Sequence, residues 1–434
     1  MTDPAPDDEV PSARALLKER DYLLFWGTRW TGSFASQIQS VAMGWQMYEL
    51  ARQGHSVNES ALLVSMLGLA AFVPVLLLTL PAGEVADRYD RKKVLLICLT
   101  GEIVSVFTLA IATVQGWTSP ALLMGIAAQF GASRAFFAPA NTALGPMLVP
   151  RKLLPRAIAW NSLAWQTASI LGPAAGGLLV ARSSQTAYFT TFGLYGLAGV
   201  LVFMIRGNAK PALNPGSRWQ LMKEGLAYVW RQKIVFGAIS LDLAAVLLGG
   251  ATALLPVFAR DVLVIHEGHY VILGVFPYEF TRAAAFGLLR SGPAIGATVV
   301  ALTLAARPVR NHAGVVMFLG VATFGIATVV FGLSKSLWLS VGALAVLGAA
   351  DMLSVYVRQT LVQLVTPDHM RGRVAAVSSV FIGASNELGE FESGVVARIL
   401  GPVRAAVFGG IGAVMVTALW ARLFPDLRRA DRLE

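Results

Sequence analysis

Long apolar runs separated by short polar connections make up most of this chain. A run of about 20 apolar residues is enough to cross a bilayer as a helix, and twelve runs of that order follow one another. Their approximate ranges are 22–50, 60–82, 94–115, 120–147, 155–181, 186–205, 234–258, 284–306, 313–333, 337–362, 374–399 and 404–424. The pattern therefore predicts an all-α membrane protein with twelve transmembrane helices.

One long connection separates the sixth run from the seventh. It starts with turn-forming residues, after which Trp219, Met222, Leu226 and Trp230 recur at helical spacing. That spacing predicts a short amphipathic helix lying in the interface plane, at the boundary between two six-helix bundles. The expected organisation is a tail at 1–21, a first bundle at 22–206, a linker at 207–233, a second bundle at 234–424 and a tail at 425–434.

The two expected bundles are related in sequence. At an offset of 217 residues, matching residues recur at corresponding depths, and an offset of 219 aligns the basic loops after the second and eighth runs. The matches include Gly131 with Gly348, Arg156 with Arg373, Gly172 with Gly389, Gly177 with Gly394, and Arg88 with Arg307. A parallel repeat of six spans predicts two pseudo-symmetric bundles with a substrate site between them, near the membrane midplane.

Composition and charge support a membrane protein. The 434 residues are 56% hydrophobic and 14% charged, with a mean hydropathy of +0.63, which is too apolar for an ordinary soluble protein. The net charge of +10 does not gather on one face, so we expect no nucleic-acid partner. Lys and Arg concentrate in alternate connections, which places both termini in the cytoplasm. Cys98 is the single cysteine, and the sequence offers no metal site.

Five ionisable residues fall inside predicted spans that correspond between the two halves: Arg29, Arg134, Asp242, Asp351 and Arg358. A charge near the bilayer centre costs at least about 2.5–3.5 kcal/mol on insertion scales, so it is functional or firmly paired. The repeat aligns Arg134 with Asp351, which puts opposite charges at equivalent places. We expect these residues to line a substrate or proton pathway, with structural pairing as the alternative. Arg29 and Arg358 lie nearer the inner surface, where snorkelling is also open to them.

The eleventh span carries a second polar group: Asn386, Glu387 and Glu390. Glu387 and Glu390 are three residues apart and share a helix face, whereas Glu392 points elsewhere. Carboxylates that share a low-dielectric site cannot all ionise, so one of them is expected to hold a proton near neutral pH. The predicted role is proton coupling, and the alternative is a polar seam between helices.

A short basic turn follows the second span. It contains Gly83, Asp87, Arg88, Arg91 and Lys92. This stretch resembles the signature loop of the major facilitator superfamily, although Asp90 stands where many members carry a second Gly. The resemblance implies that the loop acts as a conformational gate on the inner face. The alternative is an ordinary positive-inside loop.

The fifth span contains Gly172, Pro173, Gly176 and Gly177. It resembles the Gly-Pro-x-x-Gly-Gly element of exporting major facilitators, with Ala168 in place of the usual preceding Gly. The resemblance favours export over import. Close helix packing by small residues is the alternative.

The stretch from Asp351 to Leu361, followed by the eleventh span, resembles the enterobactin-exporter-like branch of major facilitators. The resemblance implies a monomeric secondary transporter of the bacterial inner membrane that exports a siderophore or related small molecule in exchange for protons. It also implies that spans one, four, seven and ten line the cavity. No nucleotide-binding loop is present, so the proton gradient is the expected energy source and no enzyme activity or cofactor is expected. A lipid or multidrug exporter, and a scaffold or receptor that does not transport, are the alternatives.

Overall fold

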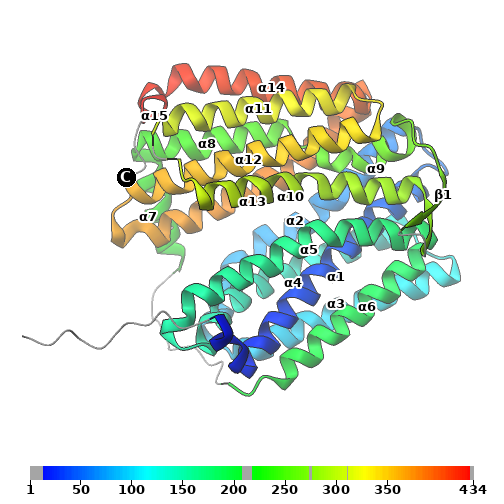
Figure 1. The fold of residues 1–434 in the computed structure, drawn as a ribbon, viewed down its shortest axis with the longest axis horizontal. Coiled ribbons are helices and arrows are strands. Elements are labelled where there is room, and N and C mark those ends of the chain that lie inside the picture. Colours follow the sequence, from blue (N-terminus) through cyan, green and yellow to red (C-terminus); the bar gives the residue numbers. More distant parts are fainter. Residues whose placement is uncertain (1–12, 208–217, 273–275, 310, 431–434) are drawn as a thin grey trace, which may run out of the picture.

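The computed structural model describes residues 13–207, 218–272, 276–309 and 311–430, and these are almost entirely helical (Figure 1). The first half contains η1 (Ala13–Lys18), α1 (Arg20–Ala51), α2 (Val57–Arg88), α3 (Arg91–Gln115), α4 (Pro120–Leu144), η2 (Gly145–Leu148), η3 (Arg151–Leu153), α5 (Leu154–Arg182) and α6 (Ser184–Met204). The second half contains α7 (Arg218–Arg231), α8 (Lys233–Leu248), η4 (Ala251–Leu254), α9 (Leu255–Val257), η5 (Phe258–Val262), β1 (Gly268–Ile272), β2 (Phe276–Phe280), α10 (Arg282–Ala306), α11 (Ala313–Leu333), α12 (Leu337–Val365), α13 (Asp368–Leu400), α14 (Pro402–Leu423) and α15 (Pro425–Arg428).

Hydropathy separates the long helices into two groups. Ten helical segments of the described chain are long and apolar enough to cross a membrane. Helices α1 and α13 are also long, at 32 and 33 residues, but they are too polar to be among the ten. Helix α1 packs against α5 and α6, and α13 packs against α2. The predicted all-α membrane fold is confirmed, while membrane crossing by α1 and α13 stays a prediction.

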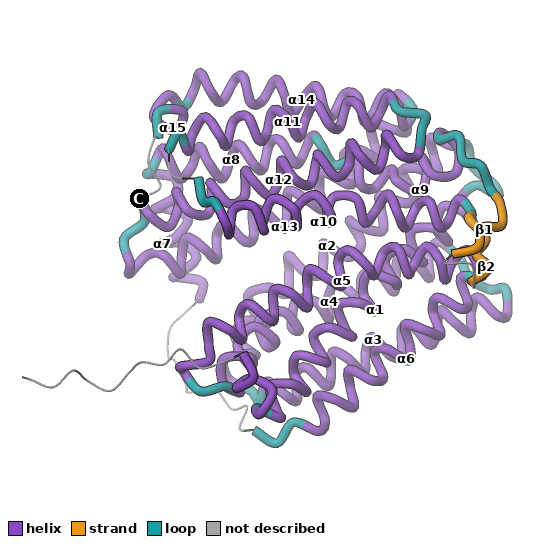
Figure 2. Tube along the Cα trace, in the orientation of Figure 1, coloured by secondary structure: helices purple, strands orange, loops and turns teal. Residues whose placement is uncertain are grey.

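The long helices form two bundles that converge at one end and separate toward the other (Figures 1 and 2). Strands β1 and β2 lie at the converging end, called here the hairpin end, and α7 and α15 lie at the opposite end, called the linker end. The bundles meet where α5 crosses α10 and where α2 crosses α13. Helix α7 occupies the second part of the predicted linker, and its Glu224 pairs with Arg373 of α13 at 2.6 Å.

A small antiparallel hairpin departs from the all-helical expectation. Strands β1 and β2 pair with Gly268 opposite Phe280, in the loop between the seventh and eighth predicted spans. The sequence indicates only that this loop is long, because its alternation of apolar and polar residues is too short to identify strands.

The internal repeat is visible as repeated backbone contacts. A Cβ added to Gly131 of α4 would strike the backbone of Ala71 in α2, and one added to Gly348 of α12 would strike the backbone of Pro293 in α10. Gly172 and Gly389 likewise press against α1 and α8, the first helices of their halves. Equivalent glycines therefore allow equivalent helix crossings in the two bundles.

The seventh predicted span, expected as one helix over 234–258, is broken. Helix α8 ends at Leu248, the chain turns at Gly249 and Gly250, and η4, α9 and η5 carry it on to Val262. A Cβ on Gly250 would strike the backbone of Gly389 in α13, so the break is packed directly on that helix. Hydropathy misses this feature because apolar residues continue through it.

We expect Gly296→Ala to destabilise the second bundle by about 1–3 kcal/mol, as overpacking does, because its new methyl group would strike the carbonyl of Ala345 in α12. Thermal unfolding of the purified protein should show the loss. Gly342→Ala in α12 is the matched control, since a Cβ there meets nothing within 4 Å. Equal melting temperatures for the two variants would contradict the close α10–α12 crossing.

Candidate functional site

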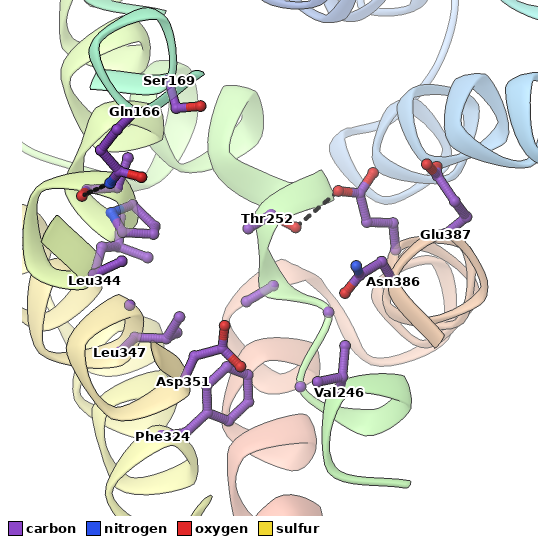
Figure 3. A pocket seen from close by; sticks show the side chains of 18 of the residues that line it. Gln166, Ser169, Val246, Thr252, Phe324, Leu344, Leu347, Asp351, Asn386 and Glu387 are labelled. Carbon is purple, nitrogen blue, oxygen red and sulfur yellow. Dashed lines mark hydrogen bonds between the residues drawn. The ribbon is translucent and has the colours of Figure 1, made fainter. Parts of the chain in front are cut away.

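A cavity of about 490 Å³ lies between the two bundles. Its walls come from α5 in the first half and from α8, η4, α10, α11, α12 and α13 in the second. Figure 3 shows Asp351 beside Phe324 on one wall, with Thr252 and Asn386 across the space. Gln166 and Trp165 of α5 also line it. The sequence-predicted residues Asp351, Asn386, Glu387 and Glu390 therefore share one cavity.

A second cavity of about 160 Å³ adjoins the first. It is lined by α1, α2 and α4 of the first half and by η4, α9, α10 and α13 of the second, with η4 supplying Thr252 and Ala253 and α9 supplying Pro256. Two arginines, Arg134 and Arg290, face it, and Glu387 and Glu390 line both cavities. The larger cavity is thus acidic, and the smaller one combines the acids with two cations.

An ion pair joins the two halves between these cavities. Arg134 Nη1 of α4 lies 3.2 Å from Glu387 Oε1 of α13, with 49% of the arginine side chain exposed and 17% of the glutamate. Glu390, one turn further on, accepts a hydrogen bond of 2.9 Å from the Thr252 hydroxyl. Gly68 of α2 makes room for both carboxylates, because a Cβ there would lie 3.2 Å from Glu390 and 3.4 Å from Glu387. The partner of Arg134 is Glu387, whereas its repeat equivalent Asp351 stands on another wall.

Asp242 and Arg358 form a separate buried pair. Arg358 Nη1 of α12 lies 3.2 Å from Asp242 Oδ2 of α8, and only 1% of Arg358 is exposed. Neither residue lines either cavity, and nor does Arg29, which lies half-buried in α1. The geometry favours a structural pairing for Asp242 and Arg358, the alternative that the sequence left open.

The basic turn is shorter than its motif indicated. Helix α2 continues through Gly83, Asp87 and Arg88, so only Tyr89 and Asp90 lie between helices. Arg88 pairs with Glu84 one turn back at 2.6 Å. The Asp90 side chain caps α3, accepting from the backbone N–H of Lys92 at 2.9 Å.

Two basic side chains of this turn bind backbone carbonyls within the first half. Lys92 Nζ donates to the carbonyls of Phe203 and Ile205 at 2.8 and 2.6 Å. Arg91 donates to the carbonyl of Ala143 at 3.3 Å. The turn therefore ties α3 to the ends of α4 and α6 in this state.

The glycines of the fifth span face two different helices. Gly172 and Gly176 lie against Gln37 and Val41 of α1 within the first half. Gly177 lies against α10 of the second half, where a Cβ would be 2.8 Å from Gly287 Cα and 2.7 Å from the carbonyl oxygen of Ala283. Pro173 also approaches Gly287 through its carbonyl. The element thus takes part in the α5–α10 crossing between the bundles.

Sequence reasoning missed Arg290 of α10. Its guanidinium donates to Ser40 Oγ of α1 at 2.9 Å, which is a second polar link between the halves. The signal was available, because Arg290 is an ionisable residue inside a predicted span, as Arg134 is.

A further polar cluster closes the hairpin end of the molecule. Tyr48 Oη of α1 donates to Asp261 Oδ2 of η5 at 2.5 Å, and Arg52 Nε lies 3.6 Å from the same carboxylate. The Arg260 guanidinium stands 5.8 Å from the centroid of the Tyr48 ring. These contacts join the first half to the second, and we call Tyr48, Arg52 and Asp261 the hairpin-end latch.

Residues 11–433 match the family of transmembrane secretion effectors, which covers almost the whole chain. The chain belongs to this family of major facilitator transporters. The predicted membership is therefore confirmed, as is the expectation of a transporter rather than an enzyme.

Curated relatives of this major facilitator are named as exporters. The enterobactin exporter EntS of Citrobacter koseri is 28% identical over 86% of this chain and 85% of its own length. The exporter of the same name from Shigella boydii serotype 18 is 25% identical, with the same shares covered.

Solved structures share the fold. A POT family transporter in complex with 5-aminolevulinic acid superimposes with a TM-score of 0.71 at 12% identity, covering 94% of this chain and 96% of that one. A D-xylose-proton symporter gives 0.67 at 13% identity, with 95% and 98% covered. At this identity the likeness concerns the fold alone.

Proposed function

We propose that this major facilitator exports a small organic molecule across the bacterial inner membrane in exchange for protons, with both termini in the cytoplasm. The relatives named enterobactin exporters support export and suggest a siderophore or related metabolite as the cargo. The distribution of Lys and Arg supports the orientation. On that orientation the linker end is cytoplasmic and the bundles are separated on the cytoplasmic side.

The observation that carries this proposal is the Arg134–Glu387 pair. It joins the halves at 3.2 Å, and both of its residues line a cavity between them. A proton on Glu387 would remove the charge that holds Arg134, and the halves could then rearrange. Proton-coupled exchange needs a group whose contacts change when a proton binds, and this pair offers one between the halves.

The neighbouring acids supply further places for a proton. Glu390 is held by a neutral partner, Thr252, and Asp351 faces the larger cavity. In the proposed cycle these carboxylates receive protons from outside and release them to the cytoplasm after the cavity reopens inward. The basic turn at Arg91 and Lys92 would keep the cytoplasmic ends of α3, α4 and α6 moving as one body.

Everted membrane vesicles with an imposed proton gradient test this proposal. The cargo is first identified by comparing metabolites in the medium of a deletion strain and its parent. We expect Arg134→Gln and Glu387→Gln each to reduce proton-driven transport of that cargo at least tenfold. Glu392→Gln, a carboxylate of α13 that lines neither cavity, is the control expected to leave transport unchanged.

Two results would speak against the proposal. Transport that persists after the gradient is collapsed would exclude proton coupling. No difference between the media of the two strains would favour a membrane scaffold or receptor.

A further inference from the structure

The charged residues that line the larger cavity are all acidic. Asp351, Glu387 and Glu390 line it, and no Lys, Arg or His does so among the residues that the structure describes. Glu387 is compensated by Arg134. Asp351 and Glu390 have no cation within ion-pair distance in the described part of the chain, although both face the cavity.

The break in the seventh span also lies at the cavity. Val246, Gly249 and Gly250 line the cavity where α8 ends, and Ala251 and Thr252 line it where η4 begins. Helix ends carry partial charges of opposite sign, so the break does not itself set the sign of the potential. The negative charge of the cavity therefore comes from its acidic side chains.

Aromatic and neutral polar groups complete the walls. Phe324 stands beside Asp351 (Figure 3), and Trp165 of α5 lines the cavity as well. Aromatic faces attract cations and also take flat apolar groups. Gln166 and Asn386 offer neutral hydrogen bonds. With a volume of about 490 Å³, the space falls within the range usual for small-molecule sites.

We propose that the larger cavity binds the transported molecule through a positively charged group, which Asp351 pairs with while Phe324 and Trp165 contact the apolar part. The proposal deepens the export function above and rests on it, by naming the charge of the cargo. Glu390 on the opposite wall gives the group a second acceptor.

A positively charged cargo would be exchanged for protons, as the proposed function requires. A cation and a proton compete for one carboxylate, so proton arrival at Asp351 releases the cargo. An anionic cargo at Arg134 would instead bind better once Glu387 is protonated and Arg134 is released. Anion and proton would then travel together, which is the opposite of exchange.

Only a few helices carry charged residues near Asp351 in the described part of the chain. Asp242 of α8 and Arg358 of α12 interact with it and are paired with each other at 3.2 Å. Across the cavity, α13 contributes Glu387 and Glu390, while α5, α10 and α11 contribute no charged residue to the described lining. Asp351 is therefore the carboxylate most open to a competing cation.

The test uses the full chain in lipid nanodiscs and two probes of the same shape, tetraphenylphosphonium and its anionic counterpart tetraphenylborate. Equilibrium dialysis against empty nanodiscs should show saturable phosphonium binding at pH 8 that weakens at least tenfold at pH 5.5. Asp351→Asn should weaken binding at pH 8 at least tenfold, and Glu392→Gln should leave it unchanged. Tetraphenylborate should show no saturable binding.

The proposal is overturned if tetraphenylborate binds as tightly as the phosphonium, or if a folded Asp351→Asn variant keeps the wild-type affinity. If gel filtration shows that this variant is misfolded, Glu390→Gln replaces it, and an unchanged affinity there overturns the proposal as well. Phosphonium binding without any proton-driven transport would overturn the export function alone. Proton-driven transport of an exclusively anionic cargo would overturn the charge assignment alone.

Discussion

Replacing Arg358 with methionine is expected to lower the free energy of unfolding by about 3–5 kcal/mol, the usual loss when one partner of a buried ion pair is removed. Arg358 is 1% exposed, and it lies 3.2 Å from Asp242. Methionine preserves most of the volume, so the loss comes from the uncompensated carboxylate. Thermal or denaturant unfolding of the purified protein measures it.

Two comparisons make this prediction specific. The double variant Asp242→Leu with Arg358→Met removes both charges and should recover most of the lost stability. Arg371→Met breaks an exposed pair with Asp368 at 2.8 Å, which should be worth at most about 1 kcal/mol. A loss of similar size for Arg358→Met and Arg371→Met would show that the buried pair is not a structural element.

On the proposed orientation, replacing Asp261 with asparagine is expected to shift the protein toward an outward-open state by roughly tenfold or more. Hydrogen bonds to charged groups contribute about 1.5–3 kcal/mol, and the hairpin-end latch joins the halves in the state described here. The shift is measured by the labelling rate of Met43→Cys, on the wall of the smaller cavity, in a Cys98→Ser background. An impermeant maleimide added outside intact cells should label it faster.

Glu267→Gln provides the matched control for the latch. Glu267 pairs with Arg282 at 3.5 Å near the same end of the molecule, but both residues belong to the second half. Labelling of Met43→Cys should therefore not change. If Asp261→Asn also leaves the rate unchanged, the latch does not hold the two halves together.

Hydropathy was sufficient to predict an all-α membrane fold, and repetition predicted equivalent helix crossings in its two halves. Apolar runs set most helix positions, because a helix that faces lipid must be apolar over its length. The offset of 217 residues anticipated that Gly131 and Gly348 make the same kind of crossing. The ionisable residues inside the spans indicated the cavity walls, and Asp351, Glu387 and Glu390 do share a cavity.

The ion pairs between these residues were harder to predict than the helices on which the residues lie. The alignment of Arg134 with Asp351 suggested complementary charges, but the partner of Arg134 is Glu387 of α13, the helix that follows the one carrying Asp351. Asp242 and Arg358 pair with each other because α8 and α12 pack together. Such choices depend on helix crossings and rotations, which no local pattern in the sequence records.

Hydropathy also failed to predict the polar helices and the break in the seventh span. Helix α1 is largely buried by its neighbours, and α13 lines both cavities, so both helices carry polar residues that a hydropathy threshold penalises. The break at Gly249 and Gly250 follows from contact with Gly389 in α13. Its signal was the glycine pair itself, which inside a predicted helix suggests a break or a close approach.

The meeting points of the bundles constrain how the molecule can move. Where α5 crosses α10, backbone approaches backbone at Gly177 and Gly287, and where α2 crosses α13, Gly394 makes room for the Ser65 side chain. Small residues therefore hold both crossings close together. We expect the two crossings to serve together as a pivot, so that opening at the linker end is accompanied by closing at the hairpin end.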